Sequence, residues 1–250
     1  MRQNTIFQES GRTTGYFAMS STTTQLERLA ALEYDYIVLD AQHGTFDDHT
    51  QGDAVRAVER GGVPAFIRVA EPTAGAVGRA LDTGAAGIIA PLVDTADEAA
   101  RIVSAAKYPP LGVRSRGTLR RSDYLVGSLE EVNAKTAVLC MIETAEGLEN
   151  VESIAAVDGV DGLYIGPNDL TIGLGGSGIG DPSVEGYFIE AVAAIREAAE
   201  AAGKFVVFHT ASGKIAQERR KLGFRHVTIA NDVNHVCEAA ASHLAVANGE

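Results

Sequence analysis

The sequence predicts an α/β protein built as a (β/α)8 TIM barrel, and three observations support this. Eight short apolar runs recur along the chain, with amphipathic helical patterns between most of them. The apolar runs are nearly continuous rather than alternating, which is typical of parallel strands buried on both faces. The chain has 250 residues, a length at which eight such units commonly close into one barrel. An open doubly wound sheet is the alternative, although no glycine-rich phosphate loop follows the first strand.

The elements follow one another in a regular alternation. We expect strands at 15–19, 34–40, 64–69, 87–93, 137–143, 162–167, 204–209 and 226–230. The clearest helical patterns cover 24–32, 97–107, 185–203 and 231–247. Glycines follow several helices, as expected where a helix ends. We see no linker or change in composition, so residues 1–250 are expected to form a single domain, with one long irregular stretch at 107–128.

Composition narrows the possible functions. Lys and Arg number 21 against 33 Asp and Glu, a formal net charge of −12. This argues against binding to nucleic acid or to an anionic membrane. The first residues lack the apolar segment of a signal peptide, and no run is long enough for a transmembrane helix, so we expect a cytoplasmic protein. The two cysteines, Cys140 and Cys237, are too few for a disulfide framework.

Two acidic residues, Glu143 and Asp169, each stand where an apolar run ends. They are separated by 26 positions (169 − 143), which suits one βαβ unit. Because parallel strands in such a unit end at the same edge, the two carboxylates are expected to lie close together. Two hard oxygen ligands in one place favour a cation such as Mg or Mn, with positions left open for substrate and water. The pair indicates an enzyme.

Other polar groups are expected at the same end of the barrel, where TIM-barrel chemistry takes place. They are Asp40, Gln42, His43, Arg68, Gly166, Pro167, Asn168 and His209. None of the five lysines is suitably placed, since Lys204 stands at the entry of a strand, so a Schiff-base mechanism is not expected. Simpler roles stay open for three of the candidate residues. His43 could be a loop histidine that hydrogen-bonds to the backbone, Arg68 could form a structural ion pair, and Asp169 could cap a helix.

Four segments resemble the HpcH/HpaI aldolase family, metal-dependent pyruvate aldolases related to 2,4-dihydroxyhept-2-ene-1,7-dioate aldolase. They are YDYIVLDAQHG, FIRV, YPPLGVRS and the long MIETAEGLENVESIAAVDGVDGLYIGPNDLT. The resemblance implies a (β/α)8 barrel whose C-terminal helix is exchanged between subunits of a homo-oligomer, commonly a hexamer. The last predicted helix carries an apolar stripe that suits such an exchange, but it equally suits packing on its own barrel. The stripe consists of Val233, Val236, Cys237, Ala240 and Leu244.

The resemblance also implies roles for individual residues. Glu143 and Asp169 match the two ligands of a divalent metal, which would be Mg, Mn or Co. His43 matches the catalytic base, and Asp82 the acid that pairs with it from a neighbouring strand-helix unit. Arg68 matches the arginine that stabilises the enolate oxygen. The remaining matches are Phe17 at the place of an active-site tryptophan, the turn of Gly166, Pro167 and Asn168 that holds the pyruvate carboxylate, and Asp40, which orients metal-bound water.

This set implies a metal-dependent aldolase that cleaves a 4-hydroxy-2-oxo acid to pyruvate or hydroxypyruvate and an aldehyde, through a metal-stabilised enolate. Departures from the family pattern at Gln42, Met141 and Asn168 leave the aldehyde open. The irregular stretch offers candidates for binding an anionic acceptor, namely Arg114, Arg116, Arg120 and Arg121, although a solvated loop explains them equally well. The alternatives are a citryl- or malyl-CoA lyase-like enzyme, an oxaloacetate decarboxylase, or a catalytically weakened protein that binds an oxo acid.

Overall fold

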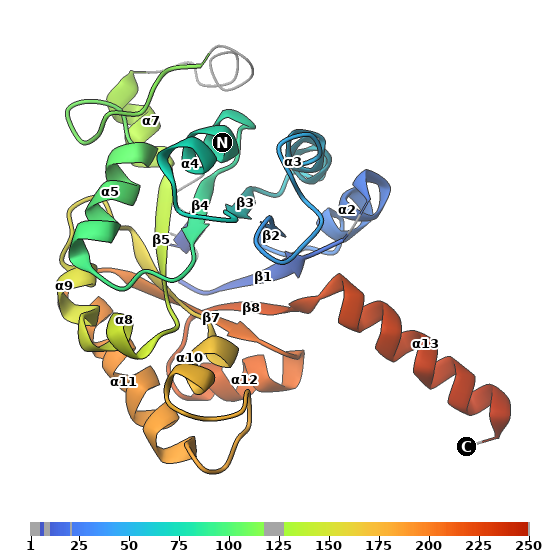
Figure 1. Cartoon of the computed structure of the whole chain (residues 1–250). Coiled ribbons are helices and arrows are strands. Elements are labelled where there is room, and N and C mark those ends of the chain that lie inside the picture. Colours follow the sequence, from blue (N-terminus) through green and yellow to red (C-terminus); the bar gives the residue numbers. More distant parts are fainter. Residues whose placement is uncertain (1–5, 8–10, 21, 118–127, 250) are drawn as a thin grey trace.

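In the computed structural model, which describes residues 6–7, 11–20, 22–117 and 128–249, eight parallel strands close into a barrel (Figure 1). The strands are β1 (Thr13–Ala18), β2 (Tyr36–Asp40), β3 (Ala65–Arg68), β4 (Gly87–Ala90), β5 (Ala137–Ile142), β6 (Gly162–Ile165), β7 (Phe205–Thr210) and β8 (His226–Asn231). Each strand pairs with its neighbours in sequence, and β8 closes the ring on β1. The predicted (β/α)8 barrel is confirmed, and the open doubly wound alternative is wrong.

Helices surround the barrel and connect successive strands (Figure 1). They are α2 (Thr23–Ala30), α3 (Gln51–Arg60), α4 (Ala74–Asp82), α5 (Ala96–Ala106), α7 (Leu129–Lys135), α8 (Ala145–Glu149), α9 (Val151–Ala155), α10 (Pro167–Gly173), α11 (Glu185–Ala201), α12 (Gly213–Lys221) and α13 (Asp232–Asn248). The local sequence determines where several of these helices begin. At α5, for example, Thr95 and Glu98 each accept a hydrogen bond from the other's backbone N–H. Such a capping box satisfies N–H groups that the helix itself leaves free.

Successive side chains of a strand point to opposite sides, into the barrel and toward the helices. Both of these faces are buried. In β2, Tyr36 and Val38 pack in the interior of the barrel with Phe66. Ile37 and Leu39 pack instead in the layer between strands and helices. This double burial is the reason why the strands read as continuous apolar runs in the sequence.

The fourth strand ends earlier than the predicted 87–93. β4 stops at Ala90, Pro91 follows, and Leu92 has a φ of 52°. Proline has no N–H to continue the ladder, and a positive φ lies outside the range of a strand. The chain therefore turns here, at the carboxyl end of the barrel.

The last helix, α13, leaves the barrel and projects from it (Figure 1). Asp232 at its start is buried, and its carboxylate accepts hydrogen bonds from the backbone N–H groups of Met19 and Ser20 at 2.7 and 2.9 Å. Farther along, Val236 is 61% and Leu244 63% exposed. The alternative prediction, in which the apolar stripe packs on its own barrel, is therefore wrong. Neither α13 nor any other helix in the described ranges is long and apolar enough to cross a membrane.

Candidate active site

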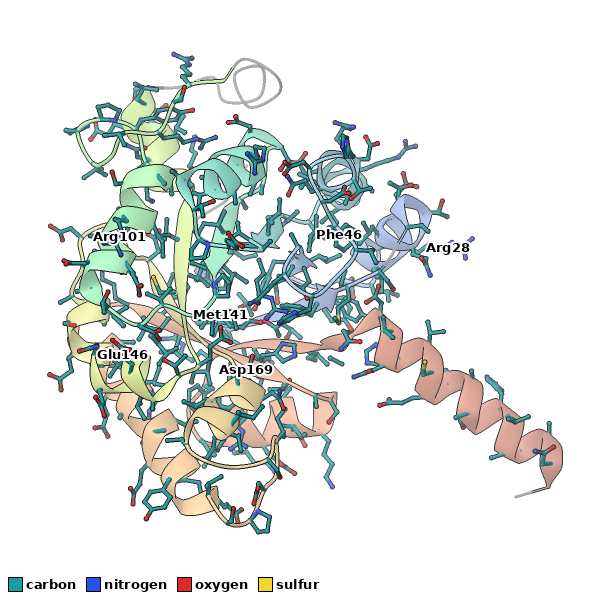
Figure 2. All side chains as sticks on the ribbon, in the orientation of Figure 1. Arg28, Phe46, Arg101, Met141, Glu146 and Asp169 are labelled. Atoms are coloured by element: carbon teal, nitrogen blue, oxygen red, sulfur yellow. The ribbon has the colours of Figure 1, made fainter. Side chains whose placement is uncertain are left out.

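A cavity of about 360 Å³ opens at the carboxyl ends of the strands. Most residues that the sequence predicts for the site line it: Phe17, His43, Arg68, Met141, Glu143, Gly166, Pro167, Asn168 and Asp169. Figure 2 shows Met141 and Asp169 near the middle of the ring of strands and helices. Barrel closure thus brings together residues that are far apart in the sequence.

Glu143 follows β5 and is buried, with 2% of the residue exposed. Its Oε1 accepts a hydrogen bond from the backbone N–H of Leu92 at 2.8 Å. Its Oε2 is buried and has no hydrogen-bond partner in the part of the chain that is described. Burial raises the pKa of Glu143 to about 7, the Leu92 hydrogen bond opposes this rise in pKa, and the Asp169 carboxylate adds to it. A buried, unpaired carboxylate oxygen is costly, and a cation beside it would offset that cost.

Leu92 holds the Glu143 carboxylate from the loop that follows β4. Its backbone lies in the left-handed region, at a φ of 52°, and its side chain is 50% exposed. A non-glycine residue in this region costs about 1–2 kcal/mol. The exposed side chain recovers little of this cost by packing. The conformation instead directs the N–H of Leu92 to Oε1 of Glu143, which leaves Oε2 available.

Asp169 lies in the first turn of α10, whose N-cap residue is Gly166. A Cβ atom on Gly166 would lie only 2.5 Å from Oε2 of Glu143, so the glycine keeps open the space beside that oxygen. Among the described residues, no side chain caps this helix by a hydrogen bond, so the capping role left open for Asp169 is not observed. The Asp169 carboxylate accepts a long hydrogen bond of 3.4 Å from the side chain of Asn168.

The two carboxylates fit a divalent metal ion. Glu143 supplies an unpaired oxygen, and Asp169 adds a second carboxylate in the same cavity. Carboxylate oxygens are preferred ligands of Mg²⁺ and Mn²⁺. Within the described ranges, no three or more His, Cys, Asp or Glu side chains gather as a metal site. Two protein ligands leave coordination positions open, which is the property of a catalytic rather than a structural metal.

Asp40, at the end of β2, organises a second group of residues. Its buried carboxylate accepts two hydrogen bonds from the guanidinium of Arg68, Nε to Oδ1 at 2.8 Å and Nη2 to Oδ2 at 2.7 Å. Its Oδ1 also accepts from the backbone N–H groups of Gln42 and His43 at 3.0 and 3.4 Å. One carboxylate thus fixes the arginine and the turn that carries His43 into the cavity.

Arg68 forms the structural ion pair that the sequence left open as its simpler role. Arg68 also lines the cavity, with its guanidinium 4.9 Å from the centre of the Phe17 ring. A bidentate pair to a carboxylate is geometrically specific, since the planar guanidinium cannot rotate away without losing both bonds. Asp40 therefore holds Arg68 in a fixed orientation beside the cavity.

Replacing Asp40 with asparagine is expected to destabilise the protein by about 3 kcal/mol, because Arg68 would remain buried without its partner charge. Urea unfolding followed by circular dichroism measures the change. Asp48→Asn is a matched control, since Asp48 pairs with Arg79 at the surface, with both side chains more than half exposed. The control is expected to change the free energy of unfolding by less than about 1 kcal/mol. Equal effects of the two substitutions would contradict this account of Asp40.

Asp82 does not lie where the sequence analysis expected it. It is the last residue of α4, which runs from the carboxyl end of β3 back toward the amino end of β4. Nine residues of helix span about 13 Å, so Asp82 and His43 are at opposite ends of the barrel. Asp82 accepts a hydrogen bond from Arg114 at 2.8 Å instead. The predicted pairing of Asp82 with His43 from a neighbouring strand-helix unit is therefore not formed within this chain.

The arginines of the irregular stretch are also away from the cavity where they are described. Arg114 is buried against Asp82, with its guanidinium 5.0 Å from the centre of the Tyr108 ring. Arg120 and Arg121 lie outside the described residues. Lys107, at the start of the stretch, donates hydrogen bonds to backbone oxygens of Asn133 and Thr136. All five lysines are described, and none of them lines the cavity.

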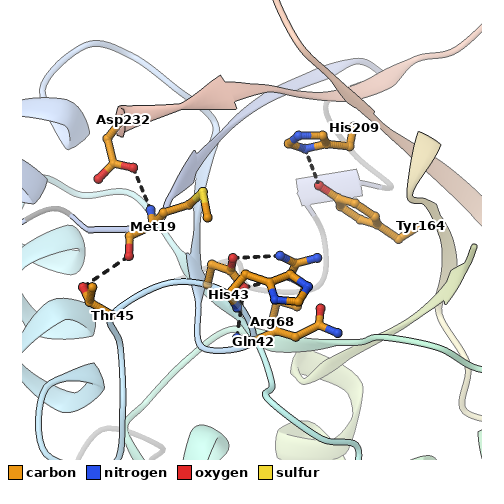
Figure 3. A network of polar contacts seen from close by, with 9 residues as sticks. Met19, Gln42, His43, Thr45, Arg68, Tyr164, His209 and Asp232 are labelled. Atoms are coloured by element: carbon orange, nitrogen blue, oxygen red, sulfur yellow. Dashed lines mark hydrogen bonds and ion pairs between the residues drawn. The ribbon is translucent and has the colours of Figure 1, made fainter. Parts of the chain in front are cut away.

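Several residues that sequence reasoning missed line the cavity: Met19, Tyr164, Ile179, Ala211, Ala230, Asn231 and Asn234. His209, which the sequence placed at a strand end without a role, lines it too. Tyr164 lies within β6 and points into the barrel, where its hydroxyl is 3.4 Å from Nδ1 of His209 (Figure 3). Met141 on β5, two residues before Glu143, faces the same side as Glu143, and Tyr164 pairs with Met141, so all three face the interior of the barrel.

The fold and the site together define a TIM-barrel enzyme with two carboxylates that fit a divalent metal, an arginine and a histidine at the carboxyl ends of its strands. The chain belongs to the HpcH/HpaI aldolase/citrate lyase family, whose model matches residues 13–239. Family membership confirms the resemblance identified from the sequence, and it brings a divalent metal as cofactor.

Two relatives of known activity and one solved structure illustrate the similarity. The chain is 40% identical over 224 residues to a hydroxypyruvate/pyruvate aldolase of Rhizorhabdus wittichii, covering 89% of each chain. It is 31% identical over 234 residues to a 2-keto-3-deoxy-L-rhamnonate aldolase of Salmonella gallinarum, covering 91% of this chain and 86% of the relative. An HpcH/HpaI aldolase from Desulfitobacterium hafniense superposes with a TM-score of 0.90 at 24% identity, covering 98% of this chain and 96% of the other, which shows the shared fold. The prediction of an aldolase is confirmed at the level of enzyme class.

Proposed function

We propose that this protein is a divalent-metal-dependent aldolase that reversibly cleaves a 4-hydroxy-2-oxo acid to pyruvate or hydroxypyruvate and an aldehyde. One observation carries the proposal: the buried, unpaired Oε2 of Glu143 shares a cavity with Asp169, Arg68 and His43. The arrangement supplies a metal-ligand pair, a fixed positive charge and a titratable group in one place. These are the groups needed to stabilise an enolate and to move a proton.

Glu143 and Asp169 would hold the metal, and Mg, Mn or Co suits such oxygen ligands. When bound, the metal supplies a Lewis acid that polarises the 2-oxo group of the substrate. Arg68, oriented by Asp40, stabilises the negative charge that develops on the enolate oxygen. His43 takes the proton of the substrate's 4-hydroxyl group as the bond between carbons 3 and 4 breaks, and it returns a proton in the reverse direction.

The substrate carboxylate is assigned to the turn of Gly166, Pro167 and Asn168. These residues line the cavity at the start of α10, next to the two carboxylates. The first N–H groups of a helix have no partner within the helix and attract an anion. Phe17 and Met141 contribute apolar surface to the lining of the cavity, and they limit the access of water to the reacting atoms.

A screen of substrates tests the proposed function. Purified protein loaded with Mg²⁺, Mn²⁺ or Co²⁺ is incubated with pyruvate or hydroxypyruvate and a panel of aldehydes, and new carbon–carbon bonds are detected by mass spectrometry. Formation of 4-hydroxy-2-oxo acids is the expected result. Arms with oxaloacetate and with a malyl-CoA thioester address the alternative decarboxylase and lyase activities. Turnover of the thioester alone would contradict the proposal, and so would binding of an oxo acid without turnover in any arm.

We also propose that the protein is a cytoplasmic homo-oligomer, a hexamer by analogy with the family resemblance, in which α13 packs against a neighbouring copy. The exposure of Val236 and Leu244 on a projecting helix supports this assembly. Truncation after His235 is expected to dissociate the oligomer while leaving the barrel folded, because Asp232 and His235 keep their contacts with Met19 and Tyr16. Light scattering measures the mass. A full-length protein that is monomeric at micromolar concentration would contradict the exchange.

A further inference from the structure

His209 is a histidine in the cavity that the proposed mechanism does not use. It lies near the end of β7, and its side chain lines the cavity together with Tyr164 and Phe17. Its Nδ1 is 3.4 Å from the Tyr164 hydroxyl (Figure 3). Its ring also meets the Phe17 ring edge-on, with the ring centres 5.0 Å apart. These contacts come from β1 and β6, both from the interior of the barrel, and orient the imidazole.

The imidazole is neutral at physiological pH. Burial lowers the pKa of His209 to about 4, and the Arg68 guanidinium lowers this pKa further. A neutral imidazole has one nitrogen that donates and one that accepts. Nδ1 is engaged with Tyr164, and the imidazole makes no other hydrogen bond within the described ranges. His209 therefore offers Nε2 as one further hydrogen-bonding group toward the cavity.

A hydroxyl group is the partner that suits Nε2 in either tautomer, because a hydroxyl both donates and accepts. A methyl or methylene group at the same place would leave a polar nitrogen desolvated and unpaired. Sites built to bond a hydroxyl reject the analogue that lacks it for this reason. The position of His209 thus provides a means to discriminate between hydroxylated and deoxy substrates.

His209 also lies at the boundary of a second cavity, of about 330 Å³. Pro167, Ile179, His209 and Ala211 line both cavities. Beyond His209 the second cavity is lined by further polar side chains, namely Thr210, Asp181, Glu185, Glu218 and Arg219. The two cavities thus adjoin at His209, and the second one contains further groups able to bond hydroxyls.

We propose that His209 is a specificity-determining residue that hydrogen-bonds a hydroxyl group of the substrate, so that hydroxylated substrates are preferred over their deoxy counterparts. The inference rests on the proposed aldolase function. The hydroxyl has two possible sources, carbon 3 of hydroxypyruvate or the carbon next to the carbonyl of the aldehyde. Both have the same chemistry, and they are distinguished by varying one reactant at a time.

The test compares kcat/KM for two matched pairs in wild-type protein and in His209→Phe. The first pair is hydroxypyruvate against pyruvate with one fixed aldehyde, and the second is glycolaldehyde against acetaldehyde with one fixed donor. The preference for the hydroxylated member is expected to fall by about 10- to 100-fold in one pair. His209→Gln, whose amide can still bond a hydroxyl, is expected to restore part of that preference. His49→Phe is the control, since His49 is exposed and away from the cavity, and it should leave both ratios unchanged.

The outcomes separate the inference from the proposed function. If the preference for the hydroxylated substrate falls only in the donor pair or only in the acceptor pair, the role of His209 is supported. The affected pair then identifies which hydroxyl it binds. Ratios that stay the same in His209→Phe, while aldol activity is present, overturn the inference and leave the proposed function intact. Absence of aldol products with every combination in the wild-type protein would instead overturn the proposed function.

Discussion

Replacing Glu143 with alanine is expected to lower the rate of aldol cleavage by about 10³-fold or more and to abolish binding of Mn²⁺. The expectation follows from the loss of the buried oxygen that is proposed to bind the metal, since Lewis-acid stabilisation of several kcal/mol would depend on it. Isothermal titration calorimetry measures binding of the metal, and an assay coupled to pyruvate measures cleavage. Chelation of the wild-type protein should give the same loss, and added Mg²⁺, Mn²⁺ or Co²⁺ should reverse it.

The control for this substitution is Glu146→Ala, since Glu146 lies three residues away and is exposed on α8. It should bind metal and turn over substrate as the wild-type protein does. Thermal unfolding should show that Glu143→Ala remains folded, because relief of the cost of burying the carboxylate offsets the loss of its hydrogen bond from the Leu92 N–H. Full activity of Glu143→Ala, or trapping of a covalent pyruvate adduct by borohydride, would contradict the metal mechanism.

The His43→Ala substitution is expected to slow aldol cleavage by about 10²-fold or more, the scale of a lost general base. Metal binding should be largely unaffected, because His43 is not one of the proposed ligands. The expected effect is on kcat, measured with saturating substrate. Retention of full cleavage activity would show that the proton is moved by another group.

Arg68→Ala separates the role of charge stabilisation from that of the base. Because Arg68 is assigned to the enolate oxygen, its loss should slow both aldol cleavage and the metal-dependent exchange of pyruvate methyl protons with solvent deuterium. His43→Ala should slow cleavage more than exchange. The two rates are measured on the same samples by NMR. If both substitutions slowed both rates equally, the assignment of separate roles to Arg68 and His43 would be contradicted.

Much of the site was predictable because, in a parallel barrel, the position of a residue relative to its strand determines at which end of the barrel it lies. Once eight parallel strands are recognised, the residue that follows each strand must lie at the carboxyl end of the barrel. This rule alone placed Glu143, Asp169, His43 and Arg68 in one cavity, which is where the structure has them. Their chemical roles remain proposals, since position in the cavity does not by itself assign a function.

The errors have a common origin in contacts that sequence spacing does not encode. Asp82 was matched by its motif, but the direction of α4 carries it to the far end of the barrel, where Arg114 binds it. Strand β4 ended early because Pro91 and Leu92 turn the chain toward Glu143. Tyr164 was missed because an inward-facing residue within an apolar strand looks like any other core residue until the ring closes.

The sequence by itself determined the strand and helix pattern, the barrel and the family, because hydrophobic periodicity and strand-end motifs are local properties of the chain. Only the tertiary structure decided that Oε2 of Glu143 is buried and unpaired, that Arg68 is locked to Asp40, and that His209 faces the cavity. It also decided that α13 projects from the barrel, although its apolar stripe was visible in the sequence. The physical reason is that burial and pairing depend on which neighbours barrel closure supplies, and a side chain acquires those neighbours only when distant strands meet.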